Sequence, residues 1–301
     1  MRLVTYEDAN GRHVGAVIEG DRVVDLGSVA QDMIELIEQG DAGLERARQA
    51  VQSGGSNAVP LSVVKLLAPI PRPRKNVFCV GLNYADHVAE GARARGTEVK
   101  LPEVPVYFTK APTAVNHPGD DIPIFDGVSD KIDWEVELGV IIGRAGINIP
   151  EDRAMDYIYG YTVINDVSAR DLQRAHGGQF FKGKTLDGSC PIGPWIVTRD
   201  EVADPHSLRI TLRVNGVTKQ DSNTKYFIFN LPKLISTLSA GMTIEGGDII
   251  ATGTPDGVGF ARTPPEFLKP GDQVEAEVEG IGILRNGVKL VQRDLVEART
   301  R

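Results

Sequence analysis

From about residue 75 onward the chain consists of short β-type runs separated by glycines, and this pattern constrains the fold more than any other feature. Residues 208–214 alternate apolar and polar side chains and lead into Asn215-Gly216, a dipeptide favoured in two-residue hairpin turns. Only one helix is clear, with Asn230 as its cap and Pro232 in its first turn. Numerous strands with few helices predict a mainly β (α+β) core rather than repeated βαβ units.

The first 70 residues follow a separate pattern. Three strand-like runs, 3–6, 13–18 and 22–26, are joined by turns at Asn10-Gly11 and Gly20-Asp21. We expect an amphipathic helix to follow, capped by Ser28 and ended by Gly40. The Pro-rich segment 69–73 fits neither a helix nor a central strand. We therefore predict a small N-terminal β-meander and helix domain over residues 1–70 and a main domain over residues 71–301.

Composition narrows the function classes. The formal net charge of −8 argues against nucleic acid as the main partner. Cys79 and Cys190 form no CxxC pair, which predicts two buried free thiols in a reducing compartment. The glycine-rich run 253–259 lacks the signatures of a nucleotide-binding loop. No apolar run approaches transmembrane length and the N-terminus carries early acids, so we expect a cytoplasmic protein that binds no membrane.

Three acidic residues stand where strands are expected. Glu135 and Glu137 are two residues apart, so in a strand both side chains point to one face, and Asp166 closes the apolar run 160–166. Like charges side by side repel unless a cation lies between them. Carboxylate oxygens suit a hard divalent ion, Mg²⁺ or Mn²⁺ rather than Zn²⁺. The alternative is a solvent-facing strand with two unremarkable acids.

His87 and Glu90 are candidates for acid–base chemistry. Three positions apart, they share a face if the segment 81–90 is helical, and a carboxylate beside an imidazole orients it as a general base. A surface histidine beside a surface acid is the alternative. Lys184 or Lys182, in a run with aromatic and glycine neighbours, could stabilise an oxyanion, and the residues alone do not rank the two.

Further along the chain, three polar residues are candidates for substrate binding. Arg170 and Gln173 follow Asp166 at i+4 and i+7, where an arginine suits a carboxylate substrate. The alternative for Arg170 is an exposed ion pair with Asp171 or another acid. Thr254 offers a hydroxyl in the glycine-rich run, where a plain β-turn is the alternative.

Taken together, these segments resemble the fumarylacetoacetate hydrolase family. The resemblance covers roughly residues 75–290, with every motif in order, and the matching stretches are 80–87, 108–112, 134–139, 165–171, 182–185, 190–194 and 253–259. It implies a mixed β-sandwich roll with the active site among its strands. The N-terminal meander resembles the small domain of the family's longer members, and a homodimer is implied as well.

The resemblance also implies roles. Glu135, Glu137 and Asp166 would bind one Mg²⁺ or Mn²⁺ ion per subunit, and Lys184 rather than Lys182 would be the catalytic lysine. His87 and Glu90 would activate water. Arg170, Gln173 and Thr254 match substrate-contacting positions, whereas Tyr84 and Lys110 lie in matched motifs without an assigned role.

The implied reaction is metal-dependent hydrolysis of a C–C bond in a 2,4-dioxo acid, such as an acylpyruvate or a 2,4-diketo-3-deoxy sugar acid. The substrate would be a small anionic 2-oxo acid. Oxaloacetate decarboxylation, or dehydration or isomerisation of a 2-oxo acid, is the alternative on the same metal site. A further alternative is a non-catalytic binding module that has kept the fold. We also expect residues 91–100, rich in glycine and charge, to form part of a lid.

Overall fold

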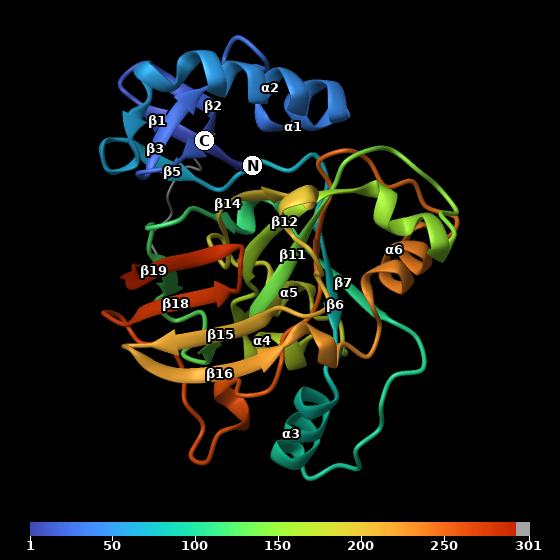
Figure 1. The fold of residues 1–301 in the computed structure, drawn as a ribbon. Coiled ribbons are helices and arrows are strands. Elements are labelled where there is room, and N and C mark those ends of the chain that lie inside the picture. Colours follow the sequence, from blue (N-terminus) through green and yellow to red (C-terminus); the bar gives the residue numbers. More distant parts are fainter. Residues whose placement is uncertain (293–301) are drawn as a thin grey trace.

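The computed structural model describes residues 1–292. A 12-stranded sheet connects the N-terminal part of the chain to the centre of the molecule (Figure 1). Its path runs β4-β3-β2-β1-β14-β12-β11-β17-β6-β7, with β5 beside β1 and β8 beside β14. These strands are β1 (Arg2–Asp8), β2 (Gly11–Ile18), β3 (Arg22–Asp25), β4 (Val59–Pro60), β5 (Lys65–Leu67), β6 (Val77–Gly81), β7 (Val106–Lys110), β8 (Val115–Asn116), β11 (Val136–Ile142), β12 (Ile158–Asn165), β14 (Cys190–Thr198) and β17 (Ile249–Ala251).

A second sheet of five strands packs against the central strands of the first (Figure 1). Its order is β16-β15-β18-β19-β9, and one core cluster joins the two sheets, with Leu138 and Val140 on one side and Leu212 and Ala276 on the other. Most pairs are antiparallel, but β17–β6, β19–β9 and β14–β8 are parallel. The mixed β-sandwich prediction is therefore confirmed. The strands are β9 (Ile122–Phe125), β15 (Arg209–Val214), β16 (Val217–Asn223), β18 (Gln273–Val278) and β19 (Gly282–Val291), and a separate pair joins β10 (Ile132–Asp133) to β13 (Ser168–Ala169).

The helices lie around these sheets (Figure 1). Helix α3 extends from the end of the molecule opposite the N-terminal strands (Figure 1). Helix α6 begins at the predicted cap, with Asn230 Oδ1 accepting from Lys233 N at 3.0 Å. The Asn215-Gly216 hairpin also forms as predicted, between β15 and β16. The helices are α1 (Met33–Glu38), α2 (Gly40–Gly54), α3 (Ala85–Arg95), α4 (Arg170–Ala175), α5 (Phe181–Lys184) and α6 (Leu231–Ser239).

The N-terminal helix differs from the expectation. Asp32, not Ser28, caps α1, because its carboxylate accepts from Glu35 N at 2.8 Å while Glu35 Oε2 accepts from Gln31 N at 2.7 Å. Gly40, at φ +57°, ends α1 as expected but also starts the longer helix α2, which the sequence pattern did not reveal.

Strand β1 pairs with β14, so the N-terminal strands extend the main sheet. A domain boundary near residue 70 stays a prediction. Cys79 and Cys190 are buried free thiols, as predicted. No helix within residues 1–292 is long and apolar enough to span a membrane.

Candidate active site

The three predicted acidic ligands meet at one end of β11 and β12. The pairing places Val136 opposite Asn165, and Asp166 N donates to Glu135 O at 2.8 Å, so Glu135 and Asp166 lie side by side where the two strands begin and end. Glu137, two residues into the strand, completes the group. Each of the three offers an oxygen within 4.8 Å of the others, and all three side chains are buried. The cluster is therefore not the solvent-facing alternative.

Each carboxylate has one oxygen held by a donor of the protein. Glu135 Oε1 accepts from Arg170 at 2.6 Å and Glu137 Oε2 accepts from Gly253 N at 2.8 Å. Asp166 Oδ1 accepts from Lys110 Nζ at 2.7 Å. Fixing one oxygen fixes the direction in which the other one points, so the three side chains are oriented before any ligand arrives.

The remaining oxygens of two carboxylates share Lys184. Its ammonium donates to Glu135 Oε2 at 2.5 Å and to Asp166 Oδ2 at 2.7 Å, and lies 5.0 Å from the ring centre of Phe108. Burial opposes the charge, but Asp166 and Glu135 outweigh it and raise the pKa of Lys184 above its ordinary value. Lys182 is exposed. The geometry therefore favours Lys184, as the family resemblance implied.

Glu135 and Glu137 have opposite electrostatic environments. Burial acts against the charge of Glu135, but Arg170 and Lys184 more than compensate and hold its pKa well below the ordinary range. For Glu137, burial raises the pKa and the charges of Asp166 and Glu135 raise it further. Among the described residues no ion pair neutralises Glu137, whose bonded partner is the Gly253 amide.

The balance of buried charge fits a divalent cation. Around the cluster, four buried carboxylates face three buried cations, so one carboxylate lacks a cationic partner among the described residues; the seven are Asp133, Glu135, Glu137, Asp166, Lys110, Arg170 and Lys184. An all-oxygen donor set with one unpaired carboxylate suits Mg²⁺ or Mn²⁺ better than a soft metal. The donor atoms of the three acidic residues are therefore those expected for a site that binds a hard divalent metal ion.

The predicted dyad is formed at the start of α3. His87 Nδ1 lies 2.9 Å from Glu90 Oε1, and the two side chains share a helix face at i and i+3. Glu90 Oε2 accepts from Gly257 N at 2.8 Å, which ties the helix to the glycine-rich turn. Because a carboxylate accepts at Nδ1, that nitrogen carries a proton and Nε2 is left as the basic position.

The glycine-rich turn, residues 253–259, supplies backbone donors to three acids. Gly253 N donates to Glu137, Gly257 N to Glu90, and Gly259 N to Asp133 at 2.6 Å. Gly257 has φ +97° and its missing Cβ would lie 2.1 Å from Lys219 O, so no side chain fits there. The turn is therefore a structural part of the site and not a plain connection.

The residues predicted to contact the substrate are close to the cluster, but each is already bonded to another residue of the protein. Arg170 is buried and pairs with Glu135 and Asp133, not with Asp171. Gln173 Oε1 accepts from Arg170 Nη1 at 3.1 Å. Thr254 Oγ1 is buried and accepts from Gln220 Nε2 at 2.8 Å. All three lie at the site, and their contact with a substrate stays a prediction.

Three further residues at the site had no role assigned from the sequence, and two of them, Asp133 and Gln220, were not singled out at all. Asp133 is fully buried and accepts from Trp134 N, Gly259 N, Phe260 N and Arg170 Nε. Lys110 holds Asp166, and Gln220 joins Val136 N to Thr254. A buried polar residue inside an apolar strand is the one signal that could have indicated Lys110, which ends β7.

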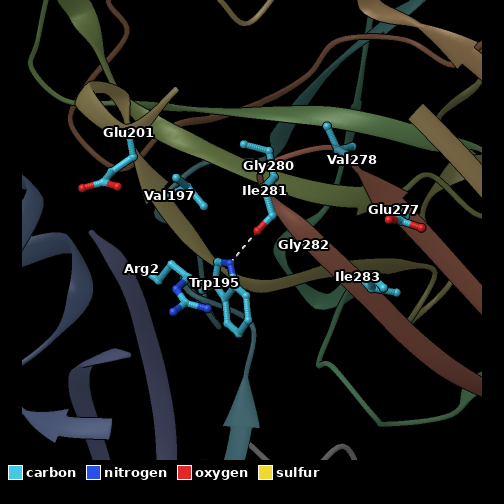
Figure 2. Close-up of a pocket in the computed structure, with 10 residues that line it drawn as sticks. All are labelled: Arg2, Trp195, Val197, Glu201, Glu277, Val278, Gly280, Ile281, Gly282 and Ile283. Atoms are coloured by element: carbon cyan, nitrogen blue, oxygen red, sulfur yellow. Dashed lines mark hydrogen bonds between the residues drawn. The ribbon is translucent and has the colours of Figure 1, made fainter. Parts of the chain in front are cut away.

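An open surface pocket of about 390 Å³ lies elsewhere, between the start of β1 and the β18–β19 turn (Figure 2). Arg2 lies over the ring of Trp195, whose Nε1 donates to Ile281 O at 2.6 Å (Figure 2). None of the residues that line this pocket belongs to the carboxylate cluster. It is therefore separate from the carboxylate cluster.

Comparison with known proteins agrees with this geometry. Residues 76–289 match the family model described as "Fumarylacetoacetate (FAA) hydrolase C-terminal". The chain belongs to the fumarylacetoacetate hydrolase family. It is 42% identical to oxaloacetate tautomerase YisK of Bacillus subtilis (strain 168), over 96% of this chain and 100% of that protein.

Solved structures of the family show the same fold. The fumarylacetoacetate hydrolase of Exiguobacterium antarcticum superposes with a TM-score of 0.81 at 38% identity, covering 97% of this chain and 100% of that one. Maleylpyruvate hydrolase of Sphingobium sp. SYK-6, in complex with manganese(II) and pyruvate, gives 0.76 at 31% identity, covering 97% and 99%. The family is thereby shown, whereas hydrolysis as the reaction of this chain is not, because the similar proteins carry different activities.

Proposed function

We propose that this protein is a divalent-metal-dependent enzyme that interconverts the enol and keto forms of a small 2-oxo acid, with oxaloacetate as the first substrate to test. The observation that carries the proposal is the buried cluster of three carboxylates, which bonds to the Lys184 ammonium and shares the glycine-rich turn 253–259 with a His–Glu dyad. The similarity to an oxaloacetate tautomerase over nearly the whole chain supports tautomerisation in particular.

The carboxylate cluster would hold the metal. A Mg²⁺ or Mn²⁺ ion held by Glu135, Glu137 and Asp166 supplies Lewis-acid polarisation of the 2-oxo group. Lys184, whose ammonium lies at this cluster, would then donate a hydrogen bond to the oxygen on which negative charge develops. Because the site is buried, that hydrogen bond is stronger than it would be in water.

The dyad would move the proton at carbon. Tautomerisation of the keto form breaks one C–H bond beside the oxo group and forms one O–H bond, with no other change in composition. His87 Nε2 takes the proton from carbon, and Glu90 stabilises the imidazolium that results. Lys184 gives a proton to the enolate oxygen, and exchange with solvent then removes the proton from His87 and restores the one on Lys184. The reverse direction uses the same groups in the opposite order.

Hydrolysis of a 2,4-dioxo acid is the second candidate. Two observations favour it: a His–Glu dyad is an arrangement suited to activating water, and the maleylpyruvate hydrolase structure holds manganese and pyruvate. In that reaction water attacks the distal carbonyl, the C–C bond breaks, and the enolate of a 2-oxo acid leaves. Decarboxylation of oxaloacetate and dehydration of a 2-oxo acid require the same stabilised enolate without the attacking water.

The test uses metal-stripped protein with and without Mn²⁺. We expect Mn²⁺-dependent acceleration of the loss of the enol absorbance of oxaloacetate, without release of pyruvate. Release of pyruvate from oxaloacetate would indicate decarboxylation, and cleavage of acetylpyruvate to pyruvate and acetate would indicate the hydrolase. Activity that does not depend on metal would refute the proposal.

Two variants connect the activity to the site. Glu137→Ala is expected to lose metal binding and turnover together, because Glu137 carries the charge without a cationic partner. His87→Ala is expected to lose turnover and keep the metal, because His87 lies outside the carboxylate cluster. Full activity in either variant would contradict the assignment.

The family resemblance further leads us to propose a homodimer in the cytoplasm, with residues 91–100 as part of a lid. Size-exclusion chromatography with light scattering tests the first. Hydrogen exchange of residues 91–100 with and without Mn²⁺ and oxalate tests the lid, and unchanged exchange would contradict it.

A further inference from the structure

Lys110 has no role in the reaction as described, yet it is the most completely buried cation of the site. Its side chain is 0% exposed, and its ammonium donates to Asp166 Oδ1 at 2.7 Å and to Val167 O at 3.0 Å. A lysine is rarely buried this fully without a partner that requires its charge. Its partner here is a predicted metal ligand.

The two oxygens of Asp166 are divided between two lysines. Lys110 holds Oδ1, and Lys184 holds Oδ2 while also bonding Glu135 Oε2. The surroundings of the two ammonium groups differ. Lys110 is at the end of β7 and has a backbone carbonyl as its second acceptor, whereas both acceptors of Lys184 are carboxylate oxygens of the cluster.

The geometry points to different tasks for these lysines. We propose that Lys110 is a positioning residue, which orients Asp166 for the metal site. Lys184, in contrast, is a cation of the protein that neutralises the metal-free cluster and that a divalent ion displaces from Glu135 and Asp166. This inference rests on the metal site of the proposed function. Lys110 fixes Oδ1 and so directs Oδ2 toward the cluster. Lys184 already occupies Oδ2 and Glu135 Oε2, which are the oxygens that Lys110 and Arg170 leave on these two carboxylates.

Displacement gives Lys184 its place in catalysis. An ammonium group that leaves the two carboxylates remains tethered beside them, and there it can donate to the substrate oxygen. Lys110 cannot exchange in this way, because the carbonyl of Val167 and the fully buried position hold it on the far side of Asp166. Arg170 on Glu135 and Gly253 N on Glu137 hold the other carboxylates in the same manner.

The proposal predicts opposite signs for two similar substitutions. Lys110→Met removes the donor that orients Asp166, and loss of such a partner typically weakens metal binding by about 10–100-fold. Lys184→Met removes the competing cation and leaves the cluster more negative, so Mn²⁺ affinity is expected to rise by about tenfold or more. If both lysines acted only through their positive charge, both substitutions would tighten metal binding.

The experiment measures Mn²⁺ affinity by titration calorimetry on metal-stripped full-length protein, with the electron paramagnetic resonance spectrum of bound Mn²⁺ as a second readout. Lys110→Gln, which keeps an amide donor without the charge, is expected to bind Mn²⁺ more tightly than Lys110→Met. If Lys110→Met does not fold, Lys110→Gln replaces it as the variant that tests the role of Lys110. Lys75→Met, which breaks a half-buried ion pair with Asp248 outside the site, controls for general effects of losing a lysine.

The outcomes separate the two proposals. Weaker Mn²⁺ binding in Lys110→Met, with an altered resonance spectrum and tighter binding in Lys184→Met, supports the division of tasks. Binding in Lys110→Met as tight as in the wild type, or binding in Lys110→Gln no tighter than in Lys110→Met, overturns the inference alone. Absence of Mn²⁺ binding in the wild type overturns the proposed function and this inference together.

Discussion

Replacing Asp133 by asparagine tests how strongly the site depends on a residue that touches neither the predicted metal nor the substrate. Asp133 Oδ1 accepts from Trp134 N at 2.8 Å and Gly259 N at 2.6 Å, while Oδ2 accepts from Phe260 N at 3.0 Å and Arg170 Nε at 2.8 Å. Every surrounding group is a donor, and the side chain is fully buried.

An asparagine keeps the shape but satisfies half of these donors. Its carbonyl oxygen can accept from one pair, and its NH₂ group then faces the other pair with donor against donor. Two hydrogen bonds to a charged acceptor are lost, each worth roughly 1.5–3 kcal/mol, and Arg170 loses one of its two counter-charges. We expect the free energy of unfolding to fall by about 3–5 kcal/mol, the range found when one partner of a buried ion pair is removed.

Equilibrium urea unfolding of the metal-free protein measures this loss. Asp221→Asn is the matched control, because Asp221 also accepts two hydrogen bonds from an arginine, Arg209, at 2.9 and 2.7 Å, but its side chain is 45% exposed. Exposed pairs contribute little, so the control should unfold at the wild-type urea concentration. If Asp133→Asn unfolds at the same concentration as Asp221→Asn, the four donors do not stabilise the fold as described.

Three other perturbations test separate parts of the structure. Glu90→Gln should lower turnover about 10²-fold or more, because the amide no longer stabilises a protonated His87. Its Mn²⁺ affinity, measured by calorimetry, should be unchanged. Equal losses of turnover and of Mn²⁺ affinity would contradict this. Gly183→Ala places a Cβ 2.3 Å from Gln173 N and should lower the free energy of unfolding by about 1–3 kcal/mol; a wild-type melting temperature would contradict that. Burial lowers the pKa of His206, whose Nε2 accepts from Leu231 N, so as the pH falls below about 6.5 the unfolded chain binds the proton first and the free energy of unfolding falls. The His206→Gln variant should show a smaller change in melting temperature between pH 7.5 and 5.5. An unchanged slope of melting temperature against pH would contradict this.

The parts of the site that follow from local spacing could be predicted from the sequence. Alternation along a strand puts Glu135 and Glu137 on one face, and helical spacing brings His87 to Glu90. The strand-ending position of Asp166 also places it correctly. For these residues the period of the secondary structure is sufficient information.

The remaining contacts depend on which strands are neighbours, and spacing does not encode that. Lys110 reaches an acid 56 residues away, and Asp133 holds an amide 126 residues away. Gln220 lies in β16, whose polar sequence predicts an exposed strand. Gln220 is nevertheless only 1% exposed, because its side-chain amide bridges Val136 N and Thr254 Oγ1. Helix α2 was missed for a different reason, since Gly40 ends one helix and its φ of +57° also turns the chain into the next.

The charge balance explains why one site can serve several reactions of 2-oxo acids. Without metal the cluster has one carboxylate more than it has cations, and with a divalent ion bound it has one positive charge in excess. A buried site in that state favours an anion that carries or develops negative charge on oxygen, which describes a 2-oxo acid passing to its enolate. Under the proposed function, the cluster would therefore stabilise the enolate that tautomerisation, decarboxylation and C–C hydrolysis have in common. The difference between these reactions would then depend on what His87 reaches, either a proton on carbon or a water molecule, and on how far α3 and the segment after it admit water. Exchanging residues around α3 should consequently change the reaction, whereas exchanging residues of the cluster should abolish all of these reactions together.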